Sequence, residues 1–152
     1  MMNKRLLMPL VAAGIFAGAL IFSLVRFAMS PSCERCVFYF SSYDSDDYYA
    51  EVRYLNKDKN RDMLNYFVDE FLLGPMTNRL KEAFPEGTRV EFCIRQGDDL
   101  HLGLSKNALM VDSVTFDIKK NLELLRYNIV NNFTNLNKIF IYIDGKSVTT
   151  EG

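Results

Sequence analysis

The chain opens with one continuous apolar stretch. Residues 6–25 carry no charged side chain, and a helix of that length spans roughly 30 Å, the thickness of the hydrocarbon core of a bilayer. Helix is the economical conformation in lipid because each backbone amide is then satisfied within the segment. The pattern predicts a transmembrane helix over residues 6–26, after a short N-terminus of residues 1–5.

Basic residues beside this stretch predict its orientation. Lys4 and Arg5 precede it, whereas Arg26 alone follows, so the positive-inside rule places the N-terminus in the cytoplasm and the rest of the chain outside. We expect a single-pass protein of the cytoplasmic membrane. Two alternatives stay open, namely cleavage after the small residues near Ser30 and lipidation of Cys33, and both also export the domain.

A short polar segment separates the apolar stretch from the first strand-like pattern. Residues 27–36 include Pro31 and are expected to form a tether. The domain that follows is predicted to span residues 37–146, with a tail over 147–152. Runs of β-branched and aromatic residues, several of them alternating with polar ones, predict five strands in this domain, over 37–40, 51–55, 90–95, 100–104 and 138–143.

Apolar residues at helical spacing predict three helices in the same domain, over 63–72, 77–84 and 118–133. The first is ended by Gly74-Pro75, which cannot continue a helix. The second is expected to be short, with Thr77 as its cap. The third has the clearest pattern, with Thr115 available as a cap and Asp117 favourable beside the positive end of the helix dipole.

The order of these elements predicts the fold class. Two pairs of neighbouring strands have the pattern of hairpins, and the longest helix leads directly into the last strand. A mixture of this kind fits helices layered on one sheet. We therefore predict an α+β fold, a two-layer domain of amphipathic helices packed on a mixed β-sheet, preceded by one N-terminal transmembrane helix.

The composition narrows the classes of partner. The 152 residues include 18 basic and 19 acidic side chains, for a formal net charge of −1. Phosphate binding needs concentrated Lys and Arg, so no nucleic-acid partner is expected. The expected partners are the lipid bilayer and other cell-envelope proteins. Three cysteines are too few for a disulfide-built scaffold, so a packed core must hold the domain together.

Cys33 and Cys36 are the two closely spaced cysteines. A structural disulfide between them suits an oxidising compartment, and unoxidised thiols are the alternative. Catalytic exchange is not expected, because the pair precedes a strand, whereas a redox pair lies at a helix N-terminus whose dipole lowers a thiol pKa. Cys93 and His101 could supply two further zinc ligands, but they do not form a second closely spaced pair. No zinc site is therefore predicted.

The loop after the first strand is acidic and rich in tyrosine. Asp44, Asp46 and Asp47 lack the glycine and the distal glutamate of an EF-hand, so a solvated loop is expected there rather than a calcium site. Exposed tyrosines commonly anchor protein interfaces. The candidate interaction surface therefore consists of the neighbouring tyrosines Tyr43, Tyr48 and Tyr49.

The sequence contains no arrangement that points to catalysis. His101, the single histidine, follows two aspartates at a strand start and is expected to be an exposed turn residue rather than a general base. No nucleophile motif accompanies it. We therefore predict no catalytic residue, no metal, no cofactor and no enzymatic activity.

Five short motifs follow one another beyond the apolar stretch. They are the opening strands at 37–40 and 51–53, the helix end Phe71–Pro75, the turn Phe84–Val90, the segment Leu102–Ser105, and the last helix and strand over 128–134 and 139–145. In this order and spacing they resemble the GerMN domain, a family of bacterial sporulation, germination and envelope proteins. Gly103 departs from the family pattern, which usually has Asp there.

The resemblance implies a module for assembly or binding outside the cytoplasm, because the family has no agreed active site. The leading expectation is a membrane-anchored, non-enzymatic interaction domain that contributes a surface to a complex in the bacterial cell envelope. The alternative is an envelope domain that binds a small ligand or a peptidoglycan fragment in a pocket. An enzyme is the third option, and it would need titratable groups that converge in a cleft.

Overall fold

The chain divides into two compact units, Met1–Ser32 and Cys33–Gly152. The first unit contains helix α1 (Lys4–Ala28), whose segment Val11–Ala28 has a mean hydropathy of 2.0 and no buried residue. Such a helix is long and apolar enough to cross a bilayer. The structure is a computed structural model, and it describes residues 4–28, 32–45, 47–57, 60–110 and 117–148.

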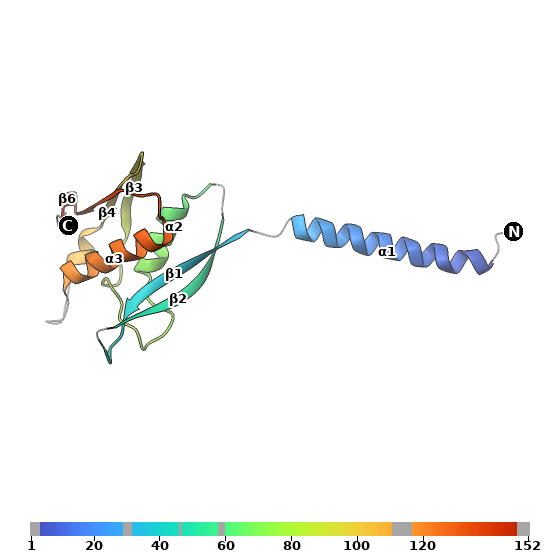
Figure 1. Cartoon of the computed structure of the whole chain (residues 1–152), viewed down its shortest axis with the longest axis horizontal. Coiled ribbons are helices and arrows are strands. Elements are labelled where there is room, and N and C mark those ends of the chain that lie inside the picture. The colour runs from blue at the N-terminus through green and yellow to red at the C-terminus, as the bar shows by residue number, and fades with distance from the viewer. Residues whose placement is uncertain (1–3, 29–31, 46, 58–59, 111–116, 149–152) are drawn as a thin grey trace. The chain divides into compact units, whose positions relative to one another are not determined.

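The second unit begins with a two-stranded antiparallel ribbon (Figure 1). Strand β1 (Cys33–Ser41) pairs with strand β2 (Tyr48–Asn56) along their whole length without a register shift. Alternate side chains of β1, those of Cys36, Phe38 and Phe40, are buried in the core. The predicted hairpin is confirmed, although β1 begins at Cys33 rather than at residue 37, so that the segment before it is shorter than predicted.

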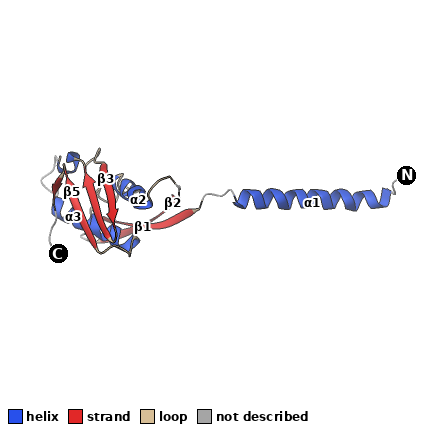
Figure 2. Ribbon diagram, turned by 90° about the horizontal axis from the view of Figure 1, so that it is seen from above, coloured by secondary structure: helices blue, strands red, loops and turns tan. Residues whose placement is uncertain are grey.

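Four further strands form a separate mixed sheet (Figure 2). Its order is β3 (Val90–Gln96), β4 (Asp99–Leu104), β5 (Lys138–Ile143) and β6 (Lys146–Ser147). The β4 and β5 strands are parallel, whereas the other two pairs are antiparallel. Asp144 and Gly145 join β5 to β6 with positive φ angles of 50° and 73°, as a two-residue hairpin turn requires.

Two helices pack with these sheets, as the sequence predicts. Helix α2 (Met63–Leu72) begins at Asp62, whose carboxylate accepts a hydrogen bond from the Asn65 amide. Helix α3 (Ile118–Asn132) begins at Asp117, whose carboxylate accepts from two backbone amides of the first turn. Asp117 is therefore the cap of α3, and the predicted cap, Thr115, lies outside the described residues. A 3₁₀ turn (Lys106–Leu109) follows β4.

One hydrophobic core joins both sheets to both helices. Aromatic side chains of the ribbon stack directly on α2, with ring centroids 4.5 Å apart for Phe38 and Phe67 and 5.2 Å apart for Phe40 and Phe71. Leucines of β4 and aliphatic residues of α3 and β5 fill the rest. Because the strands and helices share this core, the ribbon is an integral part of the domain.

Helix α3 also closes the outer edge of β1 with side-chain amides. The amide of Asn128 accepts from the backbone N–H of Tyr39 (2.7 Å) and donates to its carbonyl (3.0 Å). The amide of Asn132, one helical turn later, makes the same two bonds with Val37 at 2.9 and 2.7 Å. The two asparagines thus replace a neighbouring strand and satisfy an edge that would otherwise be open.

The α+β class is confirmed, with two differences from the predicted arrangement. The strands form two sheets rather than one, because the edge of β1 is closed by α3 instead of by another strand. The helix predicted over 77–84 is wrong. The backbone there bonds to the end of β1 instead, since Leu80 forms a bridge with Ser42 and the Lys81 amide donates to the Ser41 carbonyl at 2.8 Å.

Candidate functional site

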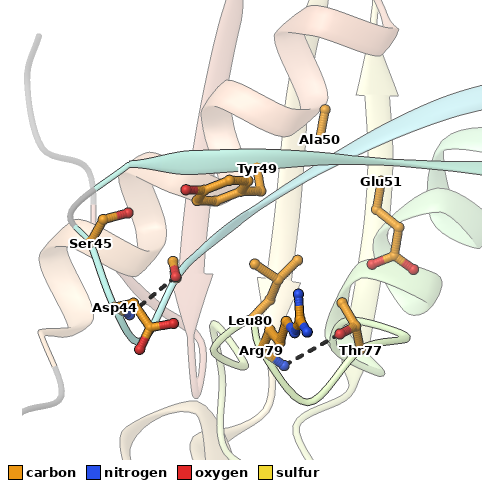
Figure 3. Close-up of a pocket in the computed structure, with 9 residues that line it drawn as sticks. Asp44, Ser45, Tyr49, Ala50, Glu51, Thr77, Arg79 and Leu80 are labelled. Atoms are coloured by element: carbon orange, nitrogen blue, oxygen red, sulfur yellow. Dashed lines mark hydrogen bonds between the residues drawn. The ribbon is translucent and has the colours of Figure 1, made fainter.

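A pocket of about 470 Å³ lies at the turn end of the β1–β2 ribbon (Figure 3). It opens between strand β2 and the irregular segment that follows α2. Its polar lining comes from both sides, with Asp44, Ser45, Tyr49, Glu51, Thr77 and Arg79. This is the size of site that a small ligand occupies in proteins.

The irregular segment is held in place by backbone hydrogen bonds to the ribbon. The Tyr43 amide donates to the Arg79 carbonyl at 3.4 Å, next to the bridge between Ser42 and Leu80. The Thr77 hydroxyl accepts from the Arg79 amide at 3.3 Å. These contacts fix one wall of the pocket and leave the Arg79 side chain exposed at its rim.

Glu51 is fixed in the pocket wall by a buried arginine. The Arg53 guanidinium, whose side chain is 9% exposed, forms a salt bridge with Glu51 at 3.3 Å and lies 4.8 Å from the centre of the Phe38 ring. It also donates to the Gly74 carbonyl at 2.7 Å. The Glu51 carboxylate in turn accepts from the Met76 amide. Glu51 and Arg53 therefore attach the ribbon to the end of α2.

The remaining charged side chains of the pocket are those of Asp44 and Arg79. Asp44 and Arg79 are both exposed and carry opposite charges, and the Tyr49 ring stands beside them as an apolar face with a hydroxyl at its tip. Such a set can bind a ligand that has both a carboxylate and hydrogen-bond donors. Among the described lining residues, the hydroxyls of Ser42, Ser45 and Thr77 have no histidine beside them to act as a base.

The structure separates the three tyrosines that the sequence groups as an interaction surface. All are exposed, with Tyr43 at 64%, Tyr48 at 43% and Tyr49 at 50%. Successive side chains of a strand point to opposite faces, so Tyr49 lines the pocket while Tyr48 stacks on Tyr127 of α3, with centroids 6.2 Å apart. Tyr43 lies in the turn with Lys81 Nζ 5.5 Å from its ring centre.

The structure has no disulfide among its three cysteines, and the redox state of Cys33 and Cys36 stays a prediction. Cys33 is exposed and its Sγ donates to Asn56, whereas Cys36 is buried in the core. Residues three apart in an extended strand are about 10 Å apart, beyond the span of a disulfide. Burial raises the pKa of Cys36 to about 11 and that of Cys93 to about 12.

The described residues contain no group of three potential metal ligands. Of the acidic loop, Asp44 and Asp47 are exposed, and Asp46 lies outside the described residues. His101 and the cysteines are also separated, because His101 points away from the core in β4 while Cys36 is buried within it.

His101 is not the exposed turn residue that the sequence predicts. It lies half-buried in β4, stacked on Phe140 with centroids 4.9 Å apart, and its Nδ1 is 3.0 Å from the Tyr142 hydroxyl. Phe92 covers Gly103 on the same face, and its ring occupies the place where a Cβ would lie. This aromatic face was missed, although the run of aromatic residues in β5 is a signal for it.

Solved structures share this fold. The first GerMN domain of the sporulation protein GerM from Bacillus subtilis aligns with a TM-score of 0.60 and 14% identity over 76% of this chain and 86% of that one. The tandem GerMN domains of the same protein align with a TM-score of 0.52 and 16% identity, over 76% of this chain and 40% of that one. No curated protein sequence matches the chain.

A family profile gives the assignment at the level of sequence. The profile, described as "Germane: Sporulation and spore germination", matches residues 37–149, which include all of the ribbon except the first four residues of β1, both helices of the domain and the four-stranded sheet. The match covers well over half of the chain, and the fold agrees with that of the GerMN domains of GerM. The chain therefore belongs to the Germane, or GerMN, family of sporulation and spore germination.

Proposed function

We propose that this protein is a non-enzymatic interaction module of the bacterial cell envelope, anchored in the cytoplasmic membrane by α1 with the GerMN domain outside. It contributes the turn end of the β1–β2 ribbon to a complex with other envelope proteins. The observation that carries the proposal is the exposure of Tyr43, Tyr48 and Tyr49 at that end, although the domain has a complete aromatic core of its own. Exposed tyrosines are typical anchors of interfaces.

Site-specific photocrosslinking in the membrane of a bacterial host tests this surface. A photoreactive phenylalanine analogue placed at Tyr43 or Tyr49 is expected to crosslink to a specific envelope protein. The matched control is the same analogue at Lys119, which is exposed on α3. Equal products from all three positions, or products from Lys119 alone, would contradict the proposal.

The orientation has its own test. A C-terminal fusion to alkaline phosphatase is expected to be active, because that enzyme matures outside the cytoplasm, and a fusion to a fluorescent protein that matures inside is expected to be dark. The reverse pattern would place the C-terminal domain in the cytoplasm and would remove the envelope assignment.

The pocket supports a second candidate function, the binding of a small ligand or a peptidoglycan fragment. Its volume of about 470 Å³ and the pair Asp44 and Arg79 favour a ligand with groups of both charges. Calorimetric titration with a soluble disaccharide-peptide fragment is expected to give saturable binding that Arg79→Ala weakens about tenfold. Lys119→Ala is the control, and equal binding by both variants would exclude the pocket.

A further inference from the structure

The outer edge of β2 is the one long strand edge that the described part of the domain leaves without a cover. Val37 and Tyr39 turn their backbone groups toward α3, so the residues opposite them, Val52 and Ala50, turn theirs away from β1. No described residue is hydrogen-bonded to these outward groups. The strand carries no proline, and its nine residues pair with β1 without a bulge.

The other strand edges in the described residues are covered, interrupted or short, and β6 leaves only residues 138–141 of β5 unpaired, where the Ile141 carbonyl accepts from the Val148 amide. Asparagines of α3 close β1, a register shift between Val90 and Phe92 interrupts β3, and β6 is only two residues long and begins with Lys146. Amides, bulges, short strands and lysines are the devices that stop edge-to-edge association. β2 has none of these four devices. It does carry two inward-pointing charges, Glu51 and Arg53, which protect an edge when they meet like charges, but these two are of opposite sign and can pair with each other across a twofold axis.

We infer that β2 pairs with β2 of a second copy of this chain, antiparallel and about a twofold axis through Val52. In this register Ala50 lies opposite Tyr54 of the other copy, and Glu51 lies opposite Arg53. All nine residues from Tyr48 to Asn56 then pair, and the two ribbons become one four-stranded sheet. The interface is isologous and closes on itself, as twofold interfaces do.

Charge selects this register over its neighbours. Sliding one strand by two residues keeps the backbone hydrogen bonds, but it places Glu51 opposite Glu51 or Arg53 opposite Arg53 of the other copy. Like charges directly opposite are destabilising, and the cost is larger here because the two side chains are only 14% and 9% exposed. In the register centred on Val52, each Glu51 lies opposite an Arg53 of the other copy instead.

The apolar side chains of the outer face complete the match. Val52 is 42% exposed and Tyr54 is 68% exposed, and in the pair each Tyr54 covers the small Ala50 of the other copy on either side of the two valines. A large residue opposite a small one packs without a gap. Of the proposed binding surface, Tyr48 and Tyr49 fall within the paired strand, whereas Tyr43 lies outside it in the turn, so crosslinks from Tyr43 report on the proposed function separately.

Cysteine pairing in the full chain, reconstituted in lipid nanodiscs, tests the register. In a Cys33→Ser background, Val52→Cys is expected to give a covalent dimer on mild oxidation, since paired Cα atoms lie about 5.5 Å apart, within disulfide range. Ala50→Cys and Tyr54→Cys are each expected to stay monomeric alone and to crosslink when mixed. A covalent dimer from Tyr54→Cys alone would overturn the inference. So would a Val52→Cys variant that forms disulfides with another protein but not with its own second copy.

A charged substitution on the outer edge of β2 tests the affinity of self-association. Val52→Lys sets two lysines against each other across the axis and is expected to weaken self-association at least about tenfold in analytical ultracentrifugation. Val130→Lys, at a valine on α3 with 51% exposure, is the matched control and is expected to dimerise like the wild type. Gly14 and Gly18 in α1 are small residues four positions apart, a spacing that can join two membrane helices. The inference fails if Val52→Lys dimerises normally, or if only Gly14→Leu with Gly18→Leu abolishes the dimer. Loss of the dimer with retained Tyr43 crosslinks leaves the proposed function intact, whereas the reverse result removes that function alone.

Discussion

At the scale of single residues, the chemistry of the three thiols follows from where each lies. Cys33 is exposed at the start of β1, whereas Cys36 is 2% exposed and Cys93 is half-buried on the core side of β3. Desolvation is the main cause that raises the pKa of both buried thiols, to about 11 for Cys36 and about 12 for Cys93. Neither is suited to redox exchange, which needs a thiolate.

We therefore expect selective alkylation. At pH 8 a thiol with a pKa of about 11 is only about one-thousandth ionised, so iodoacetamide should modify Cys33 in the folded protein and all three cysteines after unfolding in urea. Mass spectrometry of peptides after timed quenching measures this. Fast labelling of Cys36 in the folded chain would show that β1 opens locally, and no labelling of Cys33 without reductant would indicate a disulfide after all.

Gly103 illustrates how one position depends on a neighbouring strand. The Phe92 ring of β3 occupies the space that a Cβ at this position would need. The ring covers the glycine and also contacts Tyr142, at 5.6 Å between centroids. The glycine is thus the partner of a large aromatic side chain on the adjacent strand.

At the scale of elements, the pairing of α3 with the edge of β1 holds the ribbon to the rest of the domain. A two-stranded ribbon alone is marginally stable in water. The amides of Asn128 and Asn132 add four hydrogen bonds to its backbone, and Asn128 is fully buried. The same face of α3 carries leucines of the core, so one helix both packs in the core and hydrogen-bonds to β1.

Asn128→Ala is expected to lower the free energy of unfolding by about 2 to 4 kcal/mol, because it leaves the buried N–H and C=O of Tyr39 unpaired. Urea denaturation followed by circular dichroism measures the loss. Asn131→Ala is the matched control, since Asn131 is exposed and bonds only to the Tyr127 carbonyl of its own helix. Equal effects from the two variants would show that the amides do not support β1.

At the scale of the whole molecule, the division into two units predicts independent folding. In the part of the chain that the structure describes, every residue of the hydrophobic core lies after Cys33, within the second unit. The fragment 33–152 is therefore expected to unfold cooperatively at a temperature within about 3 °C of that of the full chain in detergent, as judged by the near-ultraviolet signal of its tyrosines. A fragment without that signal would show that the first unit is needed for the fold.

The sequence by itself determined the elements whose periodicity is local. The apolar helix, the β1–β2 and β3–β4 hairpins, α2 with its Gly74 end, and β5 are all present as predicted, because apolar spacing and turn residues act over a few positions. The exposure of the turn tyrosines also follows from polar neighbours. The order of the short motifs indicated the family, because turns and helix ends are set by short stretches of chain.

Only the tertiary structure decided what depends on distant partners. Residues 77–84 have the spacing of a helix, but their backbone bonds to β1, thirty or more positions earlier, and so the pocket wall forms there. The sequence suggests that His101 is a turn residue, but in the fold Phe140 and Tyr142 of the parallel strand β5 lie beside it. The strands divide into two sheets because two asparagine side chains complete β1. Contacts of this kind are made between segments far apart in sequence, and no local pattern encodes which groups will meet.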